Sequence, residues 1–78
     1  MSQRELDIFL RIDRQKIHDL SYILEVEDNM ANIRKYENGL LRIIVPEDLF
    51  EDLMTLLDGI REVVPFEVER VEVNQGSA

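Results

Sequence analysis

The chain has no cysteine, few basic residues and no long hydrophobic run. The lack of cysteine excludes disulfides and thiolate metal sites, and it fits a cytoplasmic protein. Nine basic residues against 17 acidic residues give a net charge of −8, which disfavours binding to nucleic acids and to anionic membranes. We therefore expect no cofactor, no nucleic-acid partner and no membrane partner.

No apolar stretch is long enough to form a signal peptide or a membrane span. A charged fraction of 33% beside 45% hydrophobic residues indicates a folded chain, and the length indicates one domain. We assign residues 1–73 to this domain and residues 74–78 to a disordered C-terminal tail. A domain of this size without disulfides has a marginal core, which raises the expectation of self-association.

Alternation of apolar and polar residues with a period of two predicts strands. In the first strand Leu6, Ile8 and Leu10 face one way, and Asp7 and Phe9 face the other. The expected strands are residues 5–13, 30–36, 40–45 and 66–73.

Two segments carry apolar residues at helical spacing. Asp13 is placed to cap the first helix, residues 14–27, and Asp28-Asn29 ends it. Pro46 and the carboxylates after it suit the first turn of a second helix, which Val64-Pro65 ends. Its expected buried stripe is Leu49, Leu53, Leu56, Ile60 and Val63, widened by Phe50 and Leu57.

The resulting element order is βαββαβ, which describes a ferredoxin-like sandwich of the α+β class. With right-handed crossovers, the antiparallel sheet has the strand order 4-1-3-2 and both helices lie on one face. The other face of the sheet is then open.

The hairpin between the two middle strands decides which residues reach the open face. A two-residue loop, Asn38-Gly39, would put Arg34 on the core side of the sheet. A three-residue loop, residues 37–39, would put Ile33 and Lys35 there, and that side would be apolar apart from Lys35. Because the register must match the buried face, we predict the three-residue loop.

This loop would place Arg34 directly opposite Arg42 on the open face. Like charges that face each other need a compensating group. Glu67 or Glu69, a second subunit or an anionic ligand could supply it. An exposed apolar patch beside the arginines indicates an interaction site, whereas arginine stems over apolar neighbours are also typical of an ordinary solvated face. The candidate contact residues are Arg11, Arg34, Arg42, Phe9, Tyr36 and Ile44.

Three other features invite a functional interpretation. His18 is the only histidine and has no serine or cysteine nucleophile to activate, so we interpret it as a structural or surface histidine. Gly59 lies inside the second helix, where we expect it to allow close packing. A cluster of carboxylates at the start of that helix complements the helix dipole and lacks a calcium-loop pattern. This cluster is Glu47, Asp48, Glu51 and Asp52.

RNA-recognition modules share the βαββαβ order and stack bases on aromatic residues of the first and third strands. Phe9 is present on the first strand, but residues 40–45 contain no aromatic residue and the net charge has the wrong sign. We expect neither RNA binding nor, without a catalytic motif, an enzyme.

The segments Asp7–Ile12, Ile23–Glu25 and Gly39–Pro46, together with His18, carry a family resemblance. They resemble a family of short bacterial proteins described only as a domain of unknown function, which implies no activity. The element order also resembles that of ACT-like regulatory domains, which bind small ligands, often amino acids, and pair through sheets or helices.

Together these observations predict a non-catalytic interaction or regulatory module that forms homodimers through its open sheet face. Arginines would supply charge-assisted contacts there, and apolar side chains would supply buried area. The alternative is a small-ligand sensor of ACT-like type that holds an anion or metabolite with the same arginines.

Overall fold

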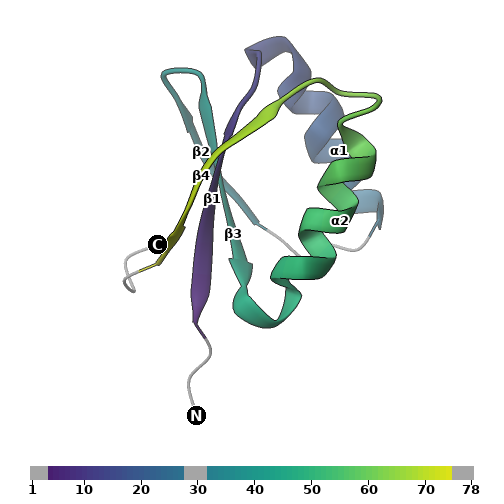
Figure 1. Ribbon diagram of the computed structural model, residues 1–78. Helices are drawn as coiled ribbons and strands as arrows, with labels where there is room; N and C mark the ends of the chain where they lie inside the picture. Colours follow the sequence, from purple (N-terminus) through teal and green to yellow (C-terminus); the bar gives the residue numbers. More distant parts are fainter. Residues whose placement is uncertain (1–3, 28–31, 75–78) are drawn as a thin grey trace.

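The structure, a computed structural model, describes residues 4–27 and 32–74 of the chain. Its four antiparallel strands form one sheet in the order β2-β3-β1-β4, which is the predicted order read from the opposite edge. Both helices lie on one side of the sheet and leave the other side open (Figure 1). The predicted α+β fold with βαββαβ order is confirmed.

The element boundaries lie close to the predicted ones. Asp13 caps the first helical segment as expected, since its Oδ1 accepts a hydrogen bond from the Gln15 N–H at 2.9 Å. The predicted helix end at Asp28-Asn29, the first residues of the second strand and tail residues 75–78 lie outside the described residues. The elements are β1 (Glu5–Arg11), η1 (Arg14–Lys16), α1 (Ile17–Glu27), β2 (Asn32–Glu37), β3 (Leu40–Pro46), η2 (Glu47–Leu49), α2 (Phe50–Ile60) and β4 (Glu67–Val73).

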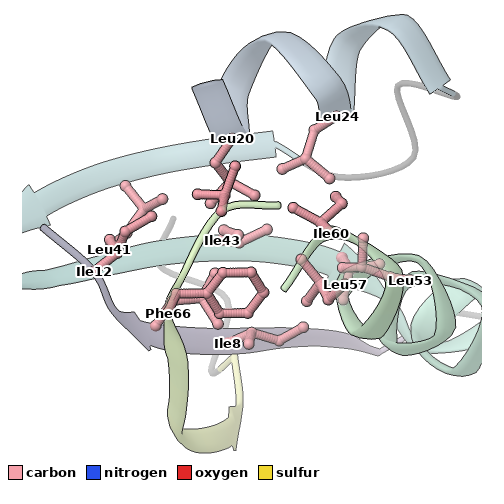
Figure 2. Close-up of a cluster of buried hydrophobic side chains, with 13 residues drawn as sticks. Ile8, Ile12, Leu20, Leu24, Leu41, Ile43, Leu53, Leu57, Ile60 and Phe66 are labelled. Atoms are coloured by element: carbon pink, nitrogen blue, oxygen red, sulfur yellow. The ribbon is translucent and has the colours of Figure 1, made fainter. Parts of the chain in front are cut away.

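The hydrophobic core fills the space between the sheet and the two helices (Figure 2). Ile8 of β1 and Ile43 of β3 meet Leu20 of α1 and Leu57 of α2 there, and all four are fully or almost fully buried. Val63 was predicted to belong to the buried stripe of α2, but it is 75% exposed because the helix ends at Ile60. The helices therefore cover the middle of the sheet and leave part of their own apolar surface in solvent.

The predicted three-residue hairpin loop is wrong. Glu37 pairs with Leu40, so the turn consists of only two residues, Asn38 and Gly39. Their φ angles are 56° and 81°, and two successive positive φ angles identify a type I′ turn. Asparagine and glycine are the residues that adopt this conformation at low cost, and the turn's twist matches that of the flanking strands.

A β-bulge in β2 restores the buried register that the two-residue turn alone would lose. Ile33 pairs with Ile43 on the core side, whereas Lys35 pairs with Arg42 on the open side, so Arg34 is an additional residue. The prediction that Arg34 lies opposite Arg42 is therefore wrong. Lys35 takes the place opposite Arg42 that was predicted for Arg34.

Tyr36 was also predicted to lie on the open face, and this prediction is wrong because the turn has two residues instead of three. It pairs with Leu41 and packs, partly buried, against the core. Its hydroxyl group donates a hydrogen bond to the carbonyl oxygen of Ile12 at 3.0 Å. Tyr36 therefore ties the hairpin to the end of β1 instead of contributing to a binding surface.

Candidate functional site

The open face is the side of the sheet opposite the helices. Four of the six predicted contact residues lie on it, Phe9 and Arg11 from β1 and Arg42 and Ile44 from β3, because they alternate with core residues. Ile44 is only 4% exposed although it lies outside the main core cluster. It therefore forms a covered part of the open face and offers little contact area.

A hollow of about 400 Å³ lies on the open face. Two of the predicted contact residues, Phe9 and Arg42, line it, and the alternation had also placed Asp7 and Leu40 on this face. Lys35 was missed because the turn was predicted to have three residues, and a second bulge, at Glu69, brings Arg70 to this side of β4. The lining residues are Asp7, Phe9, Lys35, Glu37, Asn38, Leu40, Arg42, Arg70 and Glu72.

The floor of the hollow contains a buried carboxylate. Asp7 is only 6% exposed, and its Oδ1 lies 3.2 Å from Arg42 Nε. Its Oδ2 accepts a hydrogen bond from Arg42 Nη2 at 3.3 Å, and Asn74 Nδ2 donates to both carboxylate oxygens at 3.2 Å. A buried carboxylate needs such partners, since an unpaired buried charge is costly. Asn74, which was expected in the disordered tail, thus contributes to the site.

Arg70 covers the aromatic residue of the hollow. Its guanidinium carbon lies 4.1 Å from the centre of the Phe9 ring, a cation–π contact, and its Nε donates to Glu72 Oε2 at 2.6 Å. Glu72 faces Asp7 across the β1–β4 pair. Arg70 is therefore held by an aromatic surface and by a carboxylate of its own strand.

Two further ion pairs lie at the rim of the open face. Lys35 Nζ lies 3.3 Å from Glu37 Oε1, and Arg11 Nε lies 3.1 Å from Glu69 Oε1. The hydrogen bond to Glu69 and the negative charge of its carboxylate raise the pKa of Arg11. Both pairs are exposed to solvent, so each contributes little to stability.

Each of these four basic side chains, Arg11, Lys35, Arg42 and Arg70, therefore has a carboxylate partner in the same chain. Lys35 and Arg42 face each other across β2 and β3, and they form the like-charge pair that was expected for Arg34 and Arg42. Glu37 compensates the lysine and Asp7 compensates the arginine. The basic side chains of the open face are thus ion-paired within the chain, and the face is not a simple cationic site.

Residues 10–64 match the family described as a domain of unknown function (DUF4911). The match covers more than half of the chain. The chain belongs to the DUF4911 family. No curated protein and no solved structure matches it.

The DUF4911 match runs from the end of β1 to the turn after α2, so it includes the hairpin and α1 but not β4. Of the hollow's residues, Lys35 and Arg42 lie inside the matched segment, whereas Phe9 and Arg70 lie outside it. The hollow therefore combines residues from within and from outside the DUF4911 segment.

The remaining candidates of this DUF4911 chain lie away from the hollow. His18 is exposed on α1, and the carboxylates at the start of α2 are exposed. Within residues 4–27 and 32–74, no group of three or more His, Asp or Glu side chains could hold a metal ion. No helix among these residues is long and apolar enough to cross a membrane.

Gly59 was expected to allow close packing, and this expectation is wrong. A Cβ atom at Gly59 would meet nothing within 4 Å. The residue lines a shallow apolar groove between α1 and α2 with Ile23, Leu56 and Val63. No contact among the described residues therefore requires a glycine at position 59.

Proposed function

We propose that the protein is a non-catalytic interaction module that associates with a second copy of itself through the open face. The observation that carries this proposal is the ion-paired hollow on an otherwise acidic molecule. Four of the chain's nine basic residues lie on the open face, each beside a carboxylate.

The charge distribution favours the open face over the helix side as a contact between copies. Residues 47–62, which contain α2, carry six carboxylates and a single arginine, Arg61. Two helix sides would therefore repel each other, whereas two faces with ion-paired side chains can exchange ion pairs between chains. Phe9 and Leu40, both partly exposed, would add apolar contact area within the polar rim.

The proposal is tested by Lys35→Glu, which reverses a charge at the rim without touching the buried Asp7. The side chain of Lys35 is 64% exposed, so the folded chain should tolerate the change. We expect the dissociation constant between open faces to rise about tenfold or more, because each copy would lose a cation that could pair with a carboxylate of the other copy and would present a like charge instead. Sedimentation equilibrium of the purified chain measures this change.

Lys16→Glu is the matched control, since it introduces the same charge change on the exposed turn η1, outside the hollow. It should leave the association unchanged. Equal association constants for the wild type and both variants would contradict the open face as a contact surface. Arg42→Glu is a poorer test, because it would place a second carboxylate against Asp7 and threaten folding.

A small-anion sensor is the second candidate function, and the cross-strand position of Lys35 and Arg42 favours it. A phosphate or carboxylate group could bind between these two cations if it displaced Glu37. Phosphate or a free amino acid should then raise the melting temperature of the wild type, since a ligand of the native state stabilises it. The Lys35→Glu variant should lose this effect, and no shift with any anion would contradict the sensor.

Two further expectations stay predictions. Pairing in the manner of ACT-like domains is supported by the element order alone, and a cytoplasmic location is supported by the absence of cysteine.

A further inference from the structure

We propose that two copies of the chain also pair along the outer edge of β4, so that two four-stranded sheets join into one sheet of eight strands. β4 is an edge strand of the sheet, with β1 as its neighbour on the inner side. An edge strand presents backbone N–H and C=O groups that can pair with another strand. Pairing along this edge does not require the proposed contact between open faces, but Arg70 and Glu72 belong to both surfaces.

The backbone of β4 presents alternate residues to its outer edge. The Asn74 N–H donates to the Glu5 carbonyl of β1 at 2.8 Å, so the backbone groups of Asn74 point inward. In an antiparallel ladder the direction alternates along the strand. The N–H and C=O groups of Val73 and Val71 therefore point away from β1, toward the outer edge.

The same two valines expose apolar surface. Val71 pairs with Ile8 and Val73 pairs with Leu6, so both lie on the helix side of the sheet. They are nevertheless 40% and 42% exposed, and neither belongs to the hydrophobic core cluster. A strand from a second copy, placed beside β4, would cover this surface.

The charges of β4 select one register for two identical antiparallel strands. With the two-fold axis at Val71, Val71 faces Val71 of the partner subunit on the helix side. Arg70 then faces Glu72 of the partner subunit on the open side, and the pair occurs twice by symmetry. Opposite charges at directly opposed positions stabilise a sheet.

The neighbouring registers that keep Val71 on the helix side are less favourable. A two-fold axis at Arg70 would place two arginines opposite each other, and an axis at Glu72 would place two glutamates opposite each other. The other edge of the sheet, β2, presents the adjacent cations Arg34 and Lys35. The β4 edge is therefore the self-complementary one.

Val71→Lys tests the edge directly. A lysine there places a like charge on the two-fold axis and removes apolar area, but its side chain lies on the helix side, away from the hollow. We expect association through the edge to weaken at least tenfold in sedimentation equilibrium. Val63→Lys is the matched control, because Val63 is an even more exposed valine after α2, and it should leave the mass unchanged.

A charge exchange tests the register, and it is made in the Lys35→Glu background because Arg70 and Glu72 also line the hollow of the open face. Arg70→Glu and Glu72→Arg should each abolish edge pairing, because each chain would then oppose like charges. An equimolar mixture of the two variants should form heterodimers, since every opposed pair is again Arg with Glu. The double variant Arg70→Glu/Glu72→Arg should pair with itself as the wild type does.

The two experiments together decide the proposal. A wild-type mass that Val71→Lys leaves unchanged would overturn edge pairing, as would a monomeric wild type at millimolar concentration. Loss of association in Val71→Lys without heterodimer formation in the mixture would overturn the register at Val71. Circular dichroism of each variant confirms that the chain is folded before its mass is interpreted.

Discussion

At the scale of single residues, the structure depends most on the buried carboxylate of Asp7. Arg42 of β3 and Asn74, which follows β4, both donate hydrogen bonds to this carboxylate. The side chain of Arg42 is itself only 25% exposed. Burying an ion pair is not strongly stabilising by itself, but removing one partner leaves an uncompensated charge. Substitution of a residue that pairs with Asp7 should therefore destabilise the fold.

We predict that Arg42→Ala lowers the free energy of unfolding by about 3 kcal/mol, because the Asp7 carboxylate would lose its charged partner. Urea denaturation followed by circular dichroism measures the change. Arg61→Ala removes an exposed arginine that lies 3.9 Å from Asp58 and should cost less than about 1 kcal/mol. Similar losses in both variants would show that Asp7 does not need Arg42.

At the scale of elements, glycine has opposite effects in the hairpin and in α2. We predict that Gly59→Ala raises the free energy of unfolding by up to about 1 kcal/mol, because alanine has the higher helix propensity and its Cβ meets no atom within 4 Å. Thermal unfolding of the purified variant measures the gain. A loss of stability would mean that the groove between α1 and α2 is occupied in the folded protein.

Gly39→Ala provides the contrasting result. Gly39 has a φ of 81°, and an L-residue in this region costs roughly 1–2 kcal/mol. The space itself is adequate, since the nearest atom to the added Cβ, Arg11 Nη1, lies at 3.8 Å. The variant should therefore unfold at a lower temperature through backbone strain alone.

All four strands could be located from the sequence, but a period of two gives the facing of residues correctly only in the two central strands. β1 alternates strictly, so Ile8 and Leu10 were placed in the core and Phe9 and Arg11 on the open face. Each edge strand contains a bulge that shifts the alternation by one residue. A simple period of two assigns every residue beyond a bulge to the wrong face.

The sequence does carry a signal for each bulge. Inward-facing Ile33 and Tyr36 are three residues apart in β2, and Val68 and Val71 are three apart in β4. A spacing of three between apolar residues in a strand indicates one additional residue. Combined with Asn38-Gly39, whose preference is the two-residue turn, it would have identified the hairpin correctly. Ion-pair partners such as Asp7 and Asn74 depend on the tertiary arrangement, and no local pattern shows them.

At the scale of the whole molecule, the open face and the β4 edge are different surfaces, and each can meet its own copy about a two-fold axis. The axis for edge pairing is perpendicular to the sheet, because the helices of both copies stay on one side. The axis for packing two open faces lies parallel to the sheet. We expect these perpendicular axes to intersect, and two-fold axes that do so close into a four-chain assembly instead of growing without limit.

We therefore predict that the wild type reaches four times the 9.2 kDa mass of the chain in sedimentation equilibrium. Lys35→Glu should leave pairs joined at the edge, and Val71→Lys should leave pairs joined at the face, so each variant alone should have twice the chain mass. The double variant should be a monomer. If the wild type is a dimer that only Lys35→Glu dissociates, the contact between open faces is supported and edge pairing is contradicted. If only Val71→Lys dissociates it, edge pairing is supported and the contact between open faces is contradicted. The four masses thus test the two surfaces independently within one protein.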